Sequence, residues 1–416
     1  MKVLNITKSY RTGGAAIAAY NIHSAILRCK NIKSQYLSQS QFRSNNKGIT
    51  ARSFYLTRSF YLILGWLHQK ISNFPIIFIK DRKSHSCNLL PTSWHKYINN
   101  SDVDVVIVHW IGSGGLSIGD LLKIKKPIIW VLHDMWIFCG SEHIANDDRY
   151  IQGYYKSNKP TNALFDIDRY FWKVKKRAIN SLSNIYFVAP SQWMFDKAKQ
   201  SMILKNSKIL KINIPIEVDY WSEKSNKTHM FMDKYSDGEI NITFGSSSFS
   251  NNKGLKMFID SLILLKQRAN PKKIVINFFG CIDDGIIKRT PFSFKNYGFI
   301  SSNTDLREIY QNSDLCVFPS FIESFGQMAA EASISGAFVI AYSETGISDF
   351  IKNGKNGILF SNYSERELAN AIYESISNAK RRDVIKYNEL TIKKDLSQEF
   401  IGAKYGELLN NIKEYS

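Results

Sequence analysis

The sequence predicts an α/β protein built of two doubly wound, Rossmann-like domains, and three observations lead to this fold class. The chain has 416 residues, which is more than one ordinary hydrophobic core organises. Short, continuous apolar runs alternate with helical patterns, as in buried parallel sheets covered by helices. The alternation starts again after a polar stretch at 222–239, which we interpret as the edge of a linker.

The elements of the first half follow in order. A strand is expected at Val3–Thr7, then a glycine loop, then a helix from about 15 to 28. A second strand region lies around 34–39. The remaining apolar runs predict buried strands at 103–110, 127–132 and 185–190, which completes a domain over residues 1–220.

The second half repeats this organisation over residues 221–395. Its apolar runs predict strands at 240–245, 274–280, 315–320 and 338–343. The last segment, 396–416, has the apolar spacing of an amphipathic helix. Its apolar residues are Leu396, Phe400, Tyr405, Leu408 and Ile412.

The charge is strongly positive and unevenly distributed. The formal net charge is +19, and residues 1–100 hold fifteen Lys or Arg against one acidic residue, Asp81. Such a surface favours nucleic acid, phosphate-rich ligands or an anionic membrane face as partner, although a merely solvated basic surface is the alternative. Five scattered cysteines without a CxxC pair indicate free thiols in a reducing compartment. The strand-like start MKVLNITKSY indicates no signal peptide, and no run of 18 apolar residues predicts a membrane span.

The glycine loop after the first strand is a candidate anion or sugar site. Gly13 and Gly14 precede a helix that opens with small residues, so backbone N–H groups and the helix start can approach a ligand closely. The loop is not GxGxxG, and the second strand region lacks the acid that would hold a dinucleotide ribose, which argues against NAD. A tight turn without a ligand remains the alternative.

Two glutamates flank the start of a helix in the second half. Glu323 follows the strand at 315–320, just before a helix that we expect to begin near 325–326, and Glu331 lies about two turns inside it. Carboxylates that accept from vicinal hydroxyls make strong bidentate contacts, and a nucleotide-sugar carries such hydroxyls on its ribose and on its hexose. The alternative makes Glu323 a helix cap and Glu331 a satisfied core acid.

The stretch ESFGQMAAEASISGAFVIAYSETGISDFIKNGKNGILF resembles the signature of the family 4 retaining glycosyltransferases of GT-B fold, in the branch that builds bacterial surface polysaccharide such as O-antigen. The resemblance covers nearly the whole chain. It includes GGAAIAAYNIH, VIVHWIGSGGLSI, KPIIWVLHDMW, VAPSQW, FGSSSFSNNKGLKMFIDSL and YGFISSNTDLREIYQNSDLCVFPS. It implies two facing Rossmann-like domains, with the helix at 396–416 packing back on the first.

The resemblance also implies roles for individual residues. Glu331 would bind the ribose, Glu323 the hexose, and Lys253 would neutralise the diphosphate. Gly14 would meet the phosphate, with Gly13 beside it in the donor site, and His133 would contact the sugar near the reacting carbon. Further donor contacts are expected from the backbone of Ser324, Phe325, Gly326 and Gln327, and from the nucleobase loop 298–300 with Phe299 and Ile300. Glu323, His133 and Lys253 are the predicted catalytic set.

Two departures from the family pattern concern charge. The arginine that often precedes the lysine by six residues is Ser247 here, so Lys253, helix dipoles, Lys256 or Arg11 must meet the phosphate charge. Ile216–Glu217 replaces asparagine-glycine before Asp219. By this logic no metal or other cofactor is required. The acidic pair in 146–149 could mimic the two aspartates with which other transferases hold a cation, but it does not follow a strand.

The acceptor is expected in the first domain. The segment 51–71 mixes aromatic and aliphatic residues with Arg52, Arg58 and Trp66, which suits a membrane interface, although packing inside the domain is the alternative. Glu142 and His143 face the acceptor or form a surface loop. The resemblance implies front-face transfer of a hexose from a UDP- or GDP-sugar to a polyprenyl-diphosphate-linked glycan, at the cytoplasmic face of the membrane. A GT-B epimerase, an inactive nucleotide-sugar-binding module and a nucleic-acid binder are the alternatives; we expect no nucleic acid.

Overall fold

The structure is a computed structural model that describes residues 1–39, 67, 69–78, 84–92, 94–112, 115–145, 147–160, 165–223, 239–246, 251–268, 273–378 and 381–414. The chain forms two compact units. The first comprises Met1–Asn213 with Ile401–Ser416, and the second comprises Ile214–Phe400. The divisions therefore fall at 213/214 and 400/401, beside the predicted 220/221 and 395/396.

The first unit is organised on a six-stranded parallel sheet with the order β2-β1-β3-β4-β5-β6. The strands are β1 (Lys2–Thr7), β2 (Lys33–Ser38), β3 (Val105–Val108), β4 (Ile128–Val131), β5 (Ile185–Ala189) and β6 (Ile209–Lys211). The central strands are buried along their length, because helices cover both faces of the sheet. The order reverses between β1 and β3, which is where such folds bind ligands.

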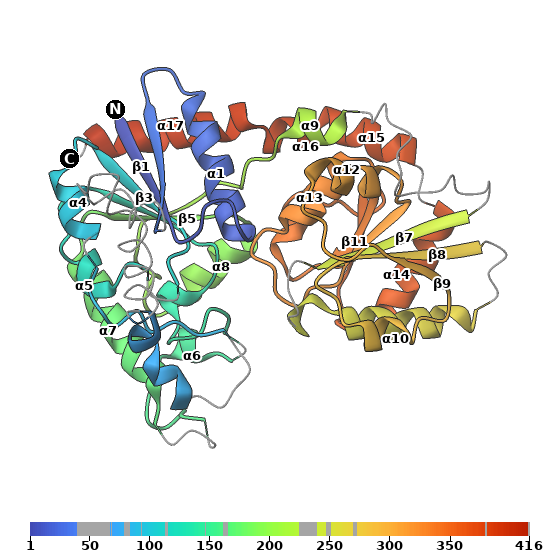
Figure 1. Ribbon diagram of the computed structural model, residues 1–416, viewed down its shortest axis with the longest axis horizontal. Coiled ribbons are helices and arrows are strands. Elements are labelled where there is room, and N and C mark those ends of the chain that lie inside the picture. Colours follow the sequence, from blue (N-terminus) through green and yellow to red (C-terminus); the bar gives the residue numbers. More distant parts are fainter. Residues whose placement is uncertain are drawn as a thin grey trace, which may run out of the picture. The chain divides into compact units, whose positions relative to one another are not determined.

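Helices of the first unit cover this sheet (Figure 1). They are α1 (Gly14–Leu27), α4 (Trp94–Asn100), α5 (Ile118–Leu121), α6 (Arg149–Gln152), α7 (Ile167–Ser181) and α8 (Gln192–Gln200), with 3₁₀ turns η2 (Phe74–Phe78) and η3 (Trp136–Phe138). Apolar residues of α4, α5 and α7 meet those of β1, β3 and β4 in one core. Ser191 and Ser117 cap α8 and α5 through their hydroxyls.

The second unit has its own six-stranded parallel sheet, with the order β12-β11-β10-β7-β8-β9. Its strands are β7 (Glu239–Ser246), β8 (Lys273–Gly280), β9 (Ser293–Asn296), β10 (Leu315–Phe318), β11 (Phe338–Tyr342) and β12 (Gly357–Phe360). The order reverses between β7 and β10. Two doubly wound α/β units are thus present, as the alternation of apolar runs predicts.

Helices of the second unit lie on both faces of its sheet (Figure 1). They are α9 (Val218–Ser222), α10 (Leu255–Lys266), α11 (Asp284–Ile287), α12 (Asn303–Gln311), α13 (Gln327–Ile334), α14 (Glu365–Asn378), α15 (Arg381–Leu390) and α16 (Ile392–Leu396), with 3₁₀ turns η4 (Asn251–Lys253) and η5 (Gly346–Asp349). Phe258 and Leu262 of α10 pack with Leu368 and Ile372 of α14 in the core. The stacked rings of Phe244 and Phe258 join α10 to the central strand β7.

The last helix, α17 (Gln398–Glu414), begins in the second unit and continues in the first. Within the first unit it packs on α1, because small residues let the two backbones approach. The Cys29 thiol donates to the Gly402 carbonyl at 3.0 Å. A Cβ at Gly402 would lie 2.4 Å from the Ala25 carbonyl oxygen, whereas one at Gly406 would meet only side-chain atoms at ordinary distance.

Two further sequence predictions concern thiols and membrane spans. All five cysteines are free, and Cys87, Cys139 and Cys316 are buried. Within the described ranges, the helices are too short or too polar to cross a bilayer. The predicted linker is described only at its two edges, 222–223 and 239.

Candidate functional site

The candidate donor site lies in the second unit, at the carboxyl ends of β7 and β10. These neighbouring strands flank the point where the strand order reverses. Lys253 ends η4 in the connection that follows β7, and Glu323 lies in the loop after β10. The parallel pairing therefore brings together two residues that are 70 positions apart in the sequence.

Backbone contacts hold three loops together around this pair. The Phe321 N–H donates to the Asn252 carbonyl at 2.8 Å, and the Gly346 N–H donates to the Glu323 carbonyl at 2.8 Å. Gly254 adopts the left-handed conformation with φ +76°, and a Cβ there would lie 2.2 Å from the Pro319 carbonyl oxygen. The loops after β7, β10 and β11 thus form one support for both charged side chains.

The two charged groups form an ion pair. Lys253 Nζ lies 2.6 Å from Glu323 Oε2, and the two side chains are 26% and 22% exposed. The lysine is therefore held in place and remains accessible. An anion that enters here would meet a positioned ammonium group, and a hydroxyl would meet a positioned carboxylate.

Glu331 is a buried acid in the first half of α13. It is the fifth residue of the helix, so it lies about one turn inside rather than the two that the sequence predicts, because α13 begins only at Gln327. Gln327 Nε2 donates to its carboxyl at 3.0 Å. Burial raises the pKa of Glu331 to about 8, and the nearby Glu217 adds to the effect. The carboxyl is thus predominantly protonated at neutral pH.

The segment between the two glutamates can contact a ligand through backbone N–H groups rather than through side chains. Phe325 is buried against Phe350, with ring centroids 5.3 Å apart. Gly326 caps α13 with φ +89°, and a Cβ there would lie 2.3 Å from Ile347. Ser324 and Gln327 flank this turn, so the predicted contribution of Ser324–Gln327 through N–H groups fits their placement.

The predicted nucleobase loop follows β9. The Gly280 N–H at the end of β8 donates to the Gly298 carbonyl at 2.7 Å, which fixes the loop at the same edge of the sheet. Phe299 is 72% exposed, while Ile300 is half-buried. An exposed aromatic ring on a fixed loop can cover an apolar or aromatic ligand face.

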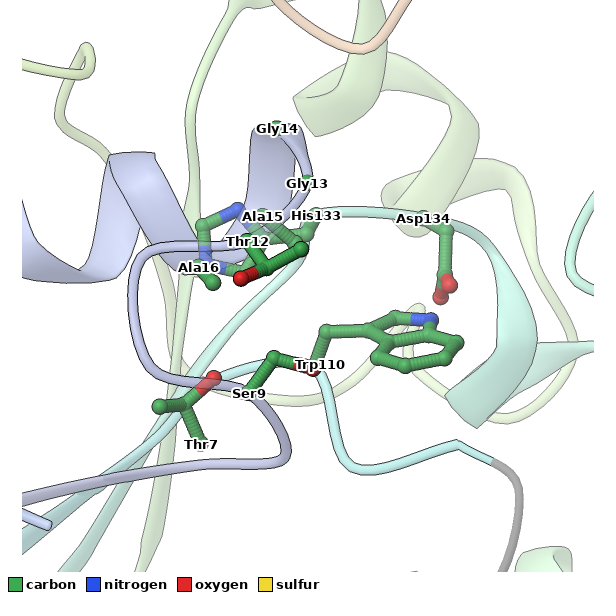
Figure 2. Close-up of a pocket in the computed structure, with 10 residues that line it drawn as sticks. All are labelled: Thr7, Ser9, Thr12, Gly13, Gly14, Ala15, Ala16, Trp110, His133 and Asp134. Atoms are coloured by element: carbon green, nitrogen blue, oxygen red, sulfur yellow. The ribbon is translucent and has the colours of Figure 1, made fainter. Parts of the chain in front are cut away.

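The first unit contains a pocket of about 320 Å³ at the carboxyl ends of β1, β3 and β4 (Figure 2). The predicted residues Gly13, Gly14 and His133 all line it. The full lining is Thr7, Ser9, Thr12, Gly13, Gly14, Ala15, Ala16, Trp110, His133 and Asp134. Figure 2 shows His133 beside the start of α1, and Asp134 beside the indole of Trp110. The pocket offers backbone, hydroxyl, imidazole and carboxylate groups to a polar ligand.

His133 belongs to a buried polar chain. Its Nε2 lies 3.0 Å from His109 Nδ1, and His109 Nε2 lies 3.1 Å from Asn5 Oδ1. Burial lowers the pKa of His133 to about 4, against the opposite effect of the Asp134 charge. Burial and the facing His133 also lower the pKa of His109 well below its ordinary value. Both imidazoles are therefore neutral at pH 7.

Glu142 and His143 are both buried, so the predicted surface loop is wrong, while the acceptor role of His143 stays a prediction. His143 Nδ1 lies 2.6 Å from Asp134 Oδ2, and its Nε2 lies 2.7 Å from Ser86 Oγ. Burial raises the pKa of Asp134, but His143 and the Trp136 N–H outweigh it, so that the pKa is lowered. Ser86 has no exposed surface, so a substrate cannot reach its hydroxyl as in a serine hydrolase. His143 thus orients a carboxylate that lines the pocket.

A second buried cluster lies behind this one. His85, Glu142 and Asp168 each offer a ligand atom, and these atoms lie within 4.8 Å of one another, so the trio could hold a divalent cation. A proton on Glu142, in place of a cation, also explains how two buried carboxyl groups can lie side by side. Burial, and then the adjacent Asp168, raise the pKa of Glu142 to about 8, and Tyr154 donates to the same carboxyl. Arg149 lies 3.5 Å from Asp168 and supplies compensating positive charge.

The other predicted residues contact neighbouring side chains or lie outside the described residues. Lys256 donates to Asp260 at 2.8 Å, and the Arg11 guanidinium lies 3.9 Å from the centre of the Tyr20 ring. Asp147, from the acidic pair, accepts from the Arg149 N–H. Arg52, Arg58, Trp66 and Ser247 lie outside the described residues.

Sequence reasoning missed Asn5, His109 and Asp134. Asn5 and His109 are polar residues within or directly after apolar strand runs, and both are fully buried. A buried polar group needs a hydrogen-bonding partner, so such an interruption near the carboxyl end of a strand is a usable signal. Asp134 directly follows His133 and was available as part of the same motif.

Comparison with known proteins bears first on the second unit. Residues 228–391 match the family model described as glycosyl transferases group 1. The chain is 33% identical over 108 residues to D-inositol 3-phosphate glycosyltransferase of Corynebacterium aurimucosum, which covers 26% of this chain and 25% of that protein. A Rhodococcus erythropolis protein of the same description is 38% identical over 77 residues, covering 18% of this chain and 17% of its own length. The chain thus spans about a quarter or less of these relatives.

Solved structures resemble the chain over its full length. Sucrose-phosphate synthase from Thermosynechococcus elongatus superimposes with a TM-score of 0.68 at 13% identity and covers all of both chains. Anabaena HepE in complex with UDP gives a TM-score of 0.58 at 16% identity and covers 99% of this chain and 100% of its own. At these identities the likeness shows the fold, and the fold is GT-B, as the sequence predicts.

Proposed function

We propose that this protein is a retaining glycosyltransferase that moves a hexose from a nucleoside-diphosphate sugar to a lipid-linked glycan. The observation that carries the proposal is the placement of Lys253, Glu323 and Glu331 around the strand-order reversal of the unit that matches the group 1 family. One cation and two carboxylates, supported by backbone N–H groups, suit a ligand that combines a diphosphate with two sets of vicinal hydroxyls.

The proposed mechanism needs no enzymic nucleophile. Lys253 and the start of α13 stabilise the negative charge that grows on the leaving diphosphate, so a metal ion is not required for this task. The same diphosphate takes the proton of the attacking hydroxyl on the front face of the sugar, which retains its configuration. Glu323 releases Lys253 from their ion pair as it accepts hydroxyls of the hexose.

UDP or GDP is the proposed carrier. HepE, which shares the fold, has been crystallised with UDP and with UDP-glucose, which supports a uridine nucleotide among the candidates. The exposed Phe299 suits a nucleobase without distinguishing between the two.

The proposed acceptor is a polyprenyl-diphosphate-linked glycan of O-antigen, capsule or exopolysaccharide synthesis, used at the inner face of the cytoplasmic membrane. The segment 67–78 supports this, because it exposes Leu67, Ile71, Phe74 and Ile77 to between 40% and 64%. Together with the fourteen net positive charges of residues 1–100, such a surface suits an anionic bilayer.

The test is a donor screen. Release of nucleoside diphosphate is measured for a panel of UDP- and GDP-sugars, with and without a lipid-linked acceptor, and the anomeric configuration of the product is read by NMR. Acceptor-dependent release with a retained product supports the proposal. A free epimerised sugar, or tight binding without turnover of any donor, contradicts it.

A further inference from the structure

The polar chain behind the pocket of the first unit connects three strands. Asn5 belongs to β1, His109 follows β3, and His133 follows β4, so parallel pairing brings their side chains together at one edge of the sheet. Asn5 and His109 have no exposed surface, whereas His133 is half-buried and lines the pocket. The proton positions along this chain determine what His133 presents to a ligand.

The orientation of the Asn5 amide follows from its other neighbours. Its Nδ2 donates to the Gln35 carbonyl at 3.3 Å and to Ser34 Oγ at 2.9 Å. A backbone carbonyl only accepts hydrogen bonds, so the NH₂ group must face β2 and the oxygen must face His109. His109 Nε2 therefore carries a proton and donates it to Asn5 Oδ1.

His109 then fixes the proton on His133. A second proton on His109 would create a buried imidazolium with no carboxylate from the described residues against it, which is costly. Neutral His109 thus has a bare Nδ1, and the hydrogen bond of 3.0 Å to His133 requires His133 to donate from Nε2. Because His133 is neutral as well, its Nδ1 is unprotonated, and no described residue hydrogen-bonds to that atom.

We propose that Asn5 and His109 are positioning residues that hold His133 as the Nε2–H tautomer, so that His133 Nδ1 accepts a hydrogen bond from a hydroxyl of the ligand in this pocket. A neutral imidazole with a bare nitrogen binds a hydroxyl and repels phosphate oxygens. The phosphate of a donor must therefore be met elsewhere, for instance by N–H groups of the Gly13–Gly14 loop. In assigning that hydroxyl to a sugar, the inference rests on the proposed function; the tautomer itself does not.

The first experiment reads the tautomer directly. Long-range ¹H–¹⁵N correlation spectra of the ¹⁵N-labelled full chain at pH 7 distinguish protonated from bare ring nitrogens, and His133→Gln identifies its signals. We expect a protonated Nε2 and a bare Nδ1 on His133. A protonated Nδ1, with or without a protonated Nε2, overturns the proposal whatever the catalytic activity is.

The second experiment reverses the direction of the hydrogen bond between His109 and His133. In Asn5→Leu, which has a similar volume, His109 Nε2 faces methyl groups, and a buried N–H without an acceptor is costly. The His109 proton should move to Nδ1 and donate to His133 Nε2, which places the His133 proton on Nδ1. Ser34→Ala is the matched control, since Gln35 still orients the amide, and it should keep the wild-type tautomer. A folded Asn5→Leu protein with the wild-type tautomer overturns the proposal.

Steady-state kinetics test whether the tautomer of His133 affects ligand binding. Asn5→Leu should raise the KM for the nucleotide-sugar about tenfold, because the ligand hydroxyl then loses Nδ1 as its acceptor and must turn to accept from an N–H, while Ser34→Ala stays within twofold. Should Asn5→Leu fail to fold, His109→Asn serves instead. Its amide oxygen can take the place of Nδ1, so it should keep both the tautomer and the KM, and loss of both would count against the proposal. If no nucleotide-sugar is turned over, the proposed function fails while the spectra still decide the tautomer.

Discussion

Lys253 Nζ and Glu323 Oε2 lie 2.6 Å apart, although the two residues come from different loops of the second unit. The pair joins the residue proposed to hold the diphosphate to the residue proposed to hold the hexose. Donor binding thus requires the ammonium group to exchange a carboxylate for a phosphate, or to share both. This relationship allows the two roles to be tested separately.

Lys253→Ala should lower kcat about a hundredfold with little effect on folding. The lysine faces charge that develops in the transition state, and loss of one such donor typically costs that much. The ion pair itself is about a quarter exposed, so it contributes at most about 1 kcal/mol to the free energy of unfolding. Steady-state kinetics and urea denaturation measure the two effects. Lys393→Ala is the control, because Lys393 is as exposed as Lys253 and pairs with Glu389, and an equal loss there would argue against a specific role for Lys253.

Glu331→Gln should abolish a pH dependence of donor affinity. The wild-type carboxyl has a pKa of about 8, so donor binding should strengthen as pH rises from 6 to 9 and should release a proton. At pH 9 the variant should bind about tenfold to a hundredfold more weakly than wild type, whereas at pH 6 the two should be similar. Calorimetry in buffers of different ionisation enthalpy measures affinity and proton release; equal affinities at pH 9 would rule out the ribose role.

The same residue should influence stability. Because the folded-state pKa is raised above the ordinary 4.5, the native protein keeps a proton between pH 4.5 and 8 that the unfolded chain has already lost. The free energy of unfolding should therefore fall as pH rises through this window, by up to ~1.4 kcal/mol per pH unit from this group. Subtracting the Glu331→Gln curve from the wild-type curve isolates the contribution, and parallel curves would contradict the raised pKa.

Activity should survive an excess of chelator, because Lys253 and the start of α13 are proposed to replace a cation at the diphosphate. The measurement is turnover before and after exhaustive chelation, followed by magnesium or manganese. Activity that chelator removes and metal restores would disprove the metal-independent mechanism. Thermal unfolding with and without chelator examines His85, Glu142 and Asp168 separately, because a structural cation there would affect stability first.

Exposed apolar residues near the basic segment should bind anionic vesicles. Phe74→Ser with Ile77→Ser should reduce the part of vesicle binding that resists salt, while Arg52→Glu with Arg58→Glu should reduce the part that salt screens. Leu390→Ser is the matched control, since Leu390 is 71% exposed in the second unit. Sedimentation with vesicles of anionic and neutral lipid gives the measurement. Binding that neither pair of substitutions changes would exclude this surface as the membrane contact.

The packing of α17 on α1 predicts opposite effects for two glycines of one helix. Gly402→Ala should destabilise the protein by about 1–3 kcal/mol, since its Cβ would lie 2.4 Å from the Ala25 carbonyl oxygen. Gly406→Ala should be neutral or stabilising by up to ~1 kcal/mol, because alanine favours a helix and the site has room. Urea denaturation compares the two, and equal effects would argue against this close approach.

The central strands of both sheets were predictable from sequence, and the edge strands were less predictable. Buried central strands such as β3 and β10 are continuous apolar runs, and both units contain them as predicted. Edge strands are different, because one side of each faces solvent. β9 (SFKN) and β6 (ILK) are short or polar, so periodicity gave no signal for them.

The candidate site was predictable where one segment carries it, as with Glu323 and Glu331. Contacts between segments were not predictable, because strand pairing alone creates them. The ion pair of Lys253 and Glu323 and the chain from Asn5 to His133 are of this kind. The orientation of His143 toward Asp134 is another example.

The route of α17 has a consequence for biosynthesis. Residues 1–213 leave the ribosome long before residues 401–414, yet both belong to one compact unit. While the second unit is being made, the surface at the end of α1, from Ala25 to Cys29, has no helix to cover it. The nascent first unit is therefore incomplete during this time. The surface that α17 later covers is exposed, so chaperones can bind it and it can misassemble. Pulse proteolysis of ribosome-bound chains should find it protected only after α17 emerges.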